Sequence, residues 1–161
     1  MSKGTLTIDR EQGREIFPIL GATACFFNGE RGLELIFTVQ AGRATQTLPD
    51  TEELEAEPEV EVSVRMHKVD WDSLVGEKFE IPESYNEETD EHMTRIYYVE
   101  HEDLDDCVIE VTDRNSNGEY LVKITGECFD VNCTEGEGRT ANVTVEAWFV
   151  PEEKTPIVEK A

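Results

Sequence analysis

The stretch EVEVSVRM at residues 59–66 decides the fold class of this 161-residue chain. Val60, Val62 and Val64 alternate with charged or small polar residues, so one face of the segment is apolar and the other is polar. A period of two is typical of a half-buried β-strand. We therefore expect residues 59–66 to form a strand that covers a hydrophobic core.

The same alternation recurs in TANVTVEAWFV at residues 140–150, whose apolar face ends with Phe149 and whose other face carries Glu146 and Trp148. Strands are the natural prediction for such short apolar runs, since turn residues separate them. Further strands are expected over residues 4–9, 21–28, 33–40, 78–81, 94–100, 107–112 and 119–129.

Asn-Gly pairs predict two hairpins, at Asn28-Gly29 and at Asn117-Gly118. The second pair ends a D-x-N-x-N-G motif at residues 113–118, the order that opens a calcium loop of the EF-hand type. Such a loop needs a bidentate glutamate at its twelfth position, which is Ile124 here. We interpret the motif as a turn between two antiparallel strands, with a looser cation site as the alternative.

Helix is expected to be scarce. One turn is predicted over residues 70–76, with Asp70 as N-cap and Gly76 closing it, and another over residues 10–16. The pattern predicts an all-β, single-domain antiparallel β-sandwich over residues 1–150, with a flattened β-barrel as the alternative. Residues 151–161 contain two prolines and no strand pattern, so we expect a flexible C-terminal tail.

The chain is strongly acidic, with 37 Asp and Glu against 14 Lys and Arg and a net charge of −23. Such a charge repels nucleic acid and anionic membranes and attracts basic proteins and divalent cations. No apolar stretch reaches the roughly 18 to 20 residues of a membrane span, and no signal peptide is recognisable. We expect a cytoplasmic protein whose four cysteines are reduced. No feature of the sequence favours one oligomeric state over another.

Catalytic motifs are not recognisable: there is no nucleophile elbow and no phosphate-binding loop. An acid pair of the glycosidase kind stays open, because acids are abundant. Cys128 and Cys133 have a spacing at the edge of the zinc range and lack a second ligand pair. We expect a protein that is not an enzyme and that requires no cofactor.

The sequence therefore favours a non-enzymatic protein-binding module for a basic partner, acting as an inhibitor or immunity-type protein that masks a cationic site. The residues we expect to contact the partner are Trp148, Tyr97 and Glu146, because outward aromatic rings among acids suit a cationic surface. The alternative is a calcium-dependent or carbohydrate-binding β-sandwich, in which the acidic loops supply the ligands, above all Asp103, Asp105 and Asp106.

Overall fold

The computed structural model describes residues 3–10, 13–29, 32–45, 57–87, 91–98, 100–129 and 140–153. These residues contain no helix, and hence none that crosses a membrane. The strands are β1 (Gly4–Arg10), β2 (Gly13–Gly29), β3 (Gly32–Ala41), β4 (Glu59–Arg65), β5 (Lys78–Ile81), β6 (Tyr85–Asn86), β7 (Glu91–His92), β8 (Thr94–Tyr98), β9 (Glu100–Glu102), β10 (Asp105–Arg114), β11 (Tyr120–Phe129) and β12 (Thr140–Glu153).

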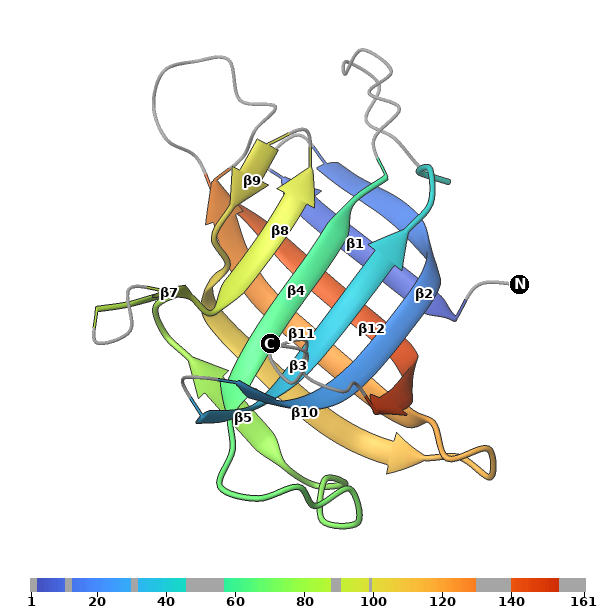
Figure 1. The fold of residues 1–161 in the computed structure, drawn as a ribbon. Helices are drawn as coiled ribbons and strands as arrows, with labels where there is room; N and C mark the ends of the chain where they lie inside the picture. Colours follow the sequence, from blue (N-terminus) through green and yellow to red (C-terminus); the bar gives the residue numbers. More distant parts are fainter. Residues whose placement is uncertain are drawn as a thin grey trace, which may run out of the picture.

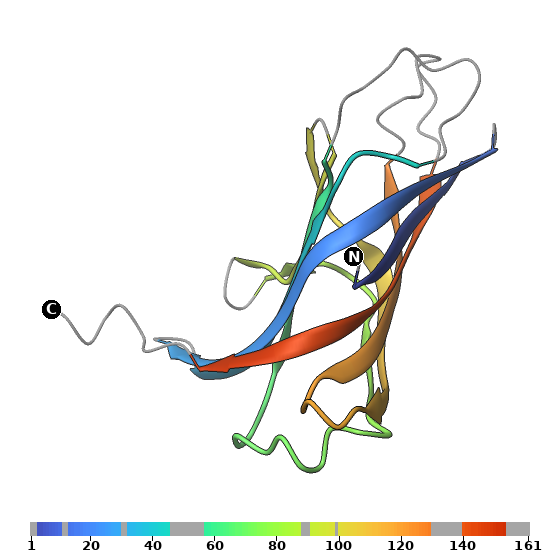
Figure 2. The same cartoon turned by 90° about the vertical axis from the view of Figure 1, so that its right-hand side faces the viewer.

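Ten of these strands form one sheet in the order β5-β10-β11-β12-β1-β2-β3-β4-β8-β9, and β6 pairs with β7 alone. The sheet folds over on itself, so that β3, β4 and β8 lie in front of β1, β11 and β12 (Figure 1). The long strand β2 bends from one layer to the other (Figure 2). A register shift between Ile19 and Gly21 interrupts its pairing with β3. Such irregularities let a strand turn a corner between layers.

The core lies between the two layers. Val60, Val62 and Val64 of β4 are buried, as the alternation predicts, and Phe149 is the last residue of the buried face of β12. Phe149 meets Phe37 of β3 edge to face, with ring centroids 5.6 Å apart. The predicted all-β antiparallel architecture with little helix is thus confirmed. Its two layers are halves of one continuous sheet, which is not closed into a barrel.

A fork in the sheet joins β12 to β2. From Asn142 to Ala147 β12 pairs with β1, but beyond the start of β1 it pairs directly with β2 in the parallel direction, from Val150 to Glu153. At the fork, a Cβ atom on Gly4 would collide with the backbone oxygen of Glu146, so only glycine fits. Strand β12 therefore continues past the predicted domain end at residue 150, and residues 154–161 lie outside the described residues.

The helical turn predicted over residues 10–16 is wrong. Arg10 and Gly13 are register partners at the end of the β1–β2 hairpin, and the residues that follow continue as strand. Arg10 and Glu15 face the interior and form an ion pair whose side chains are almost completely buried. Pairing between β1 and β2 satisfies the backbone, which overrides any helical preference of this short charged segment.

At the lower end of the molecule the predicted turn at Asn117-Gly118 is present, whereas the helical turn predicted over residues 70–76 is wrong, because these residues form a non-helical loop. Asn115 Oδ1 accepts hydrogen bonds from the backbone N–H groups of Asn117 and Glu119, and Gly118 has a φ of +79°. The calcium-loop motif is therefore a hairpin connection between β10 and β11. Asp70 accepts a hydrogen bond from the backbone N–H of Ser73, as an N-cap does, although no helix follows.

Candidate functional site

A surface pocket of about 530 Å³ lies where three parts of the chain meet. It is lined by residues 69–72 of the loop between β4 and β5, by Arg114 and Tyr120 at the β10–β11 hairpin, and by Pro151 and Glu152 near the end of β12. All three parts lie at the lower end of the molecule in Figure 1. We call this site the Trp71 pocket.

Two aromatic rings, those of Trp71 and Tyr120, line this pocket, and a third, that of Phe26, packs against Trp71. The ring of Trp71 stacks on that of Tyr120, with centroids 5.7 Å apart, and meets Phe26 edge to face at 4.7 Å. The hydroxyl of Tyr120 donates a hydrogen bond of 2.8 Å to the backbone oxygen of Trp71. Stacked and edge-on rings of this kind hold each other in fixed positions. The pocket therefore has a rigid aromatic wall on the free protein.

The loop that carries Trp71 is anchored to the core. Leu74 is buried, and the backbone N–H of Gly76 donates to the carbonyl of Val111 in β10. Gly76 has a φ of +95°, a conformation that residues with a Cβ rarely adopt. The loop thus turns sharply after Leu74, and the turn keeps Trp71 against Tyr120.

Three carboxylates and one guanidinium surround the aromatic wall. Asp70, Asp72 and Glu152 line the pocket together with Arg114. Nη1 of Arg114 lies 3.3 Å from Oδ1 of Asp72, and its Cζ lies 5.1 Å from the ring centroid of Tyr120. A guanidinium over a ring and beside a carboxylate is held by both attractions. The pocket therefore already accommodates a planar cation.

Two pKa shifts describe the electrostatics of the pocket. Burial raises the pKa of Tyr120, the positive charge of Arg114 opposes this rise, and the nearby aspartates add to it. The pKa of Asp70 is lowered, chiefly because the hydroxyl of Ser73 donates a hydrogen bond of 2.7 Å to its Oδ2. Tyr120 is consequently neutral and Asp70 is negatively charged at neutral pH.

The predicted partner residues lie on two separate parts of the sheet. Glu146 and Trp148 are on the outer face of β12, which by alternation is the face of Glu152 at the pocket. Tyr97 is exposed on β8, and four strands separate β8 from β12 in the sheet. Trp148 thus lies about 13 Å and Glu146 about 20 Å along the strand from Glu152, at the usual rise per residue, and Tyr97 lies apart from both.

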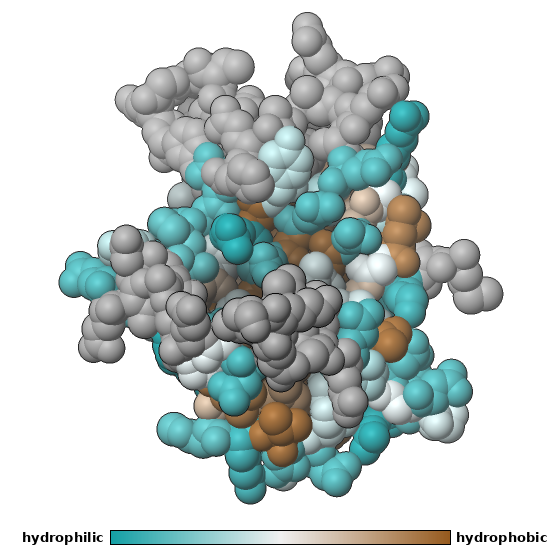
Figure 3. Space-filling model, in the orientation of Figure 1, coloured by the Kyte–Doolittle hydropathy of each residue, from teal (hydrophilic) through white to brown (hydrophobic). Residues whose placement is uncertain are grey.

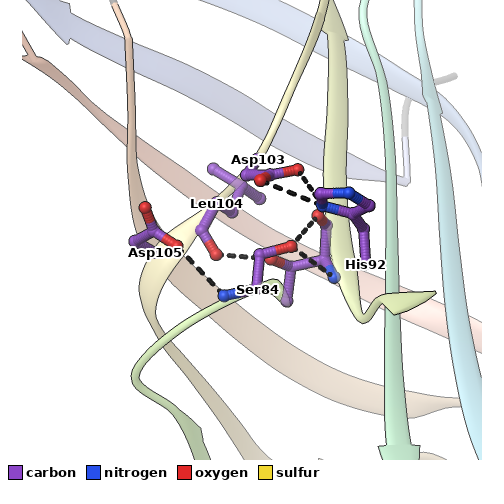
Figure 4. Close-up of polar contacts among 6 residues, drawn as sticks. Ser84, His92, Asp103, Leu104 and Asp105 are labelled. Atoms are coloured by element: carbon purple, nitrogen blue, oxygen red, sulfur yellow. Dashed lines mark hydrogen bonds and ion pairs between the residues drawn. The ribbon is translucent and has the colours of Figure 1, made fainter. Parts of the chain in front are cut away.

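A second polar cluster joins the segment after β5, the start of β8 and the segment between β9 and β10 (Figure 4), and it is formed by Ser84, His92, Thr94, Asp103, Leu104 and Asp105. We call it the Ser84 cluster. The hydroxyl of Ser84 donates to the carbonyl of Thr94 at 2.7 Å and accepts from the N–H of Thr94 at 3.2 Å. The Thr94 hydroxyl donates in turn to the carbonyl of Leu104. These bonds tie β8 to the segment that enters β10.

Serine, histidine and aspartate occur together in this cluster, but not in the arrangement of a catalytic triad. In a triad the serine hydroxyl is accessible and hydrogen-bonds to the histidine. Ser84 is fully buried and bonds to the backbone of Thr94, whereas Nδ1 of His92 lies 3.0 Å from Oδ2 of Asp103. We therefore interpret the cluster as structural, because its hydrogen bonds join the segment after β5 to β8 and join β8 to the segment before β10.

The carboxylates predicted as calcium ligands have other partners. Asp103 contacts His92, and Oδ1 of Asp105 accepts a hydrogen bond from the N–H of Ser84. Asp106 has a φ of +48° at an irregularity where β10 begins. Within the described residues, no group of three or more His, Cys, Asp or Glu side chains is placed to hold a metal ion. Calcium binding stays a prediction.

Three of the four cysteines lie in the part of the chain that the structure describes. Cys25, Cys107 and Cys128 are buried free thiols. Burial raises the pKa of Cys107 from its ordinary 9.0 to about 12, so this thiol is unreactive as a nucleophile. Cys133, the second member of the spacing considered for zinc, lies outside the described residues.

No family model, no curated protein and no solved structure matches this chain in comparisons with known proteins. The residues that line the Trp71 pocket therefore have to be interpreted from their own chemistry. Sequence reasoning missed Trp71, Arg114 and Tyr120 as site residues. The available signal was a tryptophan between two aspartates, Asp70-Trp71-Asp72, in a loop that lacks a strand pattern.

Proposed function

We propose that this protein is a non-enzymatic binding module that recognises a basic partner protein, with the Trp71 pocket as the anchoring site. The observation that carries the proposal is the combination of a rigid aromatic wall with the carboxylates of Asp70, Asp72 and Glu152 in one concave site. Aromatic anchors in pockets commonly contribute most of the affinity of a protein interface.

The net charge of −23 supports the same proposal at longer range. Most of the described surface in Figure 3 is hydrophilic, and the hydrophobic residues form small separate patches. A large negative charge on such a surface accelerates encounter with a cationic protein, and this acceleration is screened by salt. Charge thus brings the partner close, and the pocket then holds one of its side chains.

Mutation of the pocket carboxylates tests the proposal. The double variant Asp70→Asn/Asp72→Asn removes two charges from the pocket, and asparagine at position 70 still serves as an N-cap. We expect it to bind a fluorescein-labelled nona-arginine peptide about fivefold more weakly than the unmodified protein in 50 mM salt, the scale of a lost charge-assisted contact. Fluorescence anisotropy measures the dissociation constants.

The matched control is Asp9→Asn/Glu80→Gln. It removes two carboxylates that, like Asp70 and Asp72, are each ion-paired with a neighbouring basic residue, but that do not line the pocket. We expect it to change the affinity by less than about twofold. Equal losses in the two double variants would show that only net charge matters. Failure of the unmodified protein to bind the peptide in 50 mM salt would refute the proposal.

A further inference from the structure

Arg114 lines the Trp71 pocket and contacts both its aromatic and its acidic residues. It is the last residue of β10, and its guanidinium lies over the ring of Tyr120 and beside Asp72. These are the two contacts by which a protein holds the arginine of another protein, a ring face and a carboxylate. The chain therefore presents a guanidinium of its own to the site proposed for its partner.

We infer that Arg114 is an internal occupant of a guanidinium site, and that the partner group which the pocket recognises is an arginine side chain that displaces Arg114. This inference rests on the proposed function and specifies its ligand. An arginine fits better than a lysine, because a planar guanidinium stacks on a ring and donates to a carboxylate at the same time, whereas an ammonium is a compact, strongly hydrated charge.

Displacement is feasible because little holds Arg114 in place. Its side chain is 45% exposed and that of Asp72 is 92% exposed, so water screens their ion pair. Exposed pairs of this kind contribute little to stability. The aromatic wall behaves differently, since Tyr120 is buried and hydrogen-bonded to the backbone of Trp71. The wall therefore stays in position while Arg114 moves.

Removal of the internal guanidinium should free the site. We expect Arg114→Gln to bind the nona-arginine peptide about three- to tenfold more tightly than the unmodified protein, because the peptide no longer competes with the cation–π and ion-pair contacts of Arg114. Binding of a nona-lysine peptide should tighten by less than about twofold, since lysine makes poorer use of the vacated ring face.

The control for the change in net charge is Arg14→Gln. Arg14 forms an exposed ion pair with Asp9, 2.7 Å between Nε and Oδ1, at the β1–β2 hairpin and away from the pocket lining. This variant has the same net charge as Arg114→Gln, and we expect it to change either affinity by less than about twofold. Urea unfolding of both variants checks that each is folded before binding is measured.

The outcomes separate this inference from the proposed function. A selective gain in Arg114→Gln for the arginine peptide supports it. Equal gains in Arg114→Gln and Arg14→Gln, equal gains for the two peptides, or weaker binding by Arg114→Gln would overturn it. In each of those cases the proposed function stands if the unmodified protein binds and Asp70→Asn/Asp72→Asn binds more weakly. If the unmodified protein binds neither peptide, the proposed function itself fails.

Discussion

The Ser84 cluster and the Trp71 pocket both join segments that are far apart in the sequence, and both are rich in polar groups. They differ in their relation to water. Ser84 and Thr94 are fully buried and their hydroxyls donate to backbone carbonyls, whereas Asp72 and Arg114 are exposed and their charges face solvent. Buried, satisfied polar groups specify a fold, and exposed charges beside a rigid apolar wall are available to a ligand. The Ser84 cluster, which contains the three residue types of a catalytic triad, is thus the structural one of the two.

Replacement of Ser84 by alanine tests the structural half of this comparison and has the largest expected effect. The substitution removes the hydroxyl that bonds to both the N–H and the carbonyl of buried Thr94. We expect the free energy of unfolding to fall by about 2 kcal/mol, the cost of leaving buried polar groups unsatisfied. Urea unfolding at pH 7 measures the change.

Ser73→Ala is the matched control at the pocket. The Ser73 hydroxyl also donates a hydrogen bond, to Asp70, but in an exposed position where water replaces the lost partner. A loss below about 1 kcal/mol is expected. Similar losses for Ser73→Ala and Ser84→Ala would contradict the distinction between the two regions.

Cys107 follows the Ser84 cluster along β10, and the pKa of its thiol reports whether water reaches this part of the molecule. Its pKa is about 12 in the folded protein against an ordinary 9.0, so above pH 9 the unfolded state loses the proton first and the folded state loses stability. This effect begins at pH 9 and continues until about pH 12. At pH 10 it amounts to about 1.4 kcal/mol.

The experiment compares urea unfolding of the unmodified protein and of Cys107→Ala at pH 7 and at pH 10. The stability of Cys107→Ala should fall less between the two pH values, by about 1.4 kcal/mol. Other groups titrate equally in both proteins and cancel in the difference. Equal losses of stability in the two proteins between pH 7 and pH 10 would mean that water reaches the thiol.

Tyr120→Phe examines the wall of the pocket. It removes the hydroxyl that donates to the backbone of Trp71 and keeps the stacked rings. We expect a loss of about 1 kcal/mol in the free energy of unfolding, the typical net value of one hydrogen bond. The fluorescence of Trp71, recorded in a Trp148→Phe background, should change little because the stacking remains. A large spectral shift would show that the hydroxyl, and not ring packing, positions Trp71.

Asp72→Asn is expected to have the smallest effect on stability and a clear effect on binding. Its side chain is 92% exposed, so the free energy of unfolding should change by less than about 0.5 kcal/mol. Affinity for the nona-arginine peptide should nevertheless fall, by about twofold to threefold, because one of the pocket carboxylates is gone. Urea unfolding measures the stability and fluorescence anisotropy measures the affinity. An unchanged affinity together with an unchanged stability would refute a binding role for Asp72.

Much of the fold is predictable because its signals are local. Alternation in β4 identifies Val60, Val62 and Val64 as core residues, and the Asn-Gly pair at 117–118 identifies the turn between β10 and β11. The prediction fails at Arg10 and Glu15. The sequence predicts a helical turn over residues 10–16, yet both side chains lie on strands, face inward and form an ion pair. Only the pairing of β1 with β2 makes that burial possible, and pairing is not a local property.

The candidate site was less predictable than the fold. Trp71, Arg114 and Pro151 come from three segments, and no periodicity in the sequence relates them. Tyr120 is recognisable as an inward residue of β11, but its partnership with Trp71 depends on how the loop after β4 crosses the end of the sheet. Trp148 and Glu146 lie on β12, the strand that also carries Glu152 of the pocket, and their contact with a partner stays a prediction. A site assembled from loop ends is set by tertiary packing.

The position of β12 in the sheet has a consequence for how the protein forms during synthesis. Strands β1 to β4 can pair as they leave the ribosome, and β10 can pair with β11. Among the strands that the structure describes, β12 is the one that pairs with both groups, with β11 on one side and with β1 and β2 on the other. Its register with β1, Gly4 opposite Ala147, links residues near opposite ends of the chain. Contacts of such long sequence separation form slowly. We therefore expect the nascent chain to expose two incomplete half-sheets until residue 153 has emerged, a period in which a chaperone would protect it best.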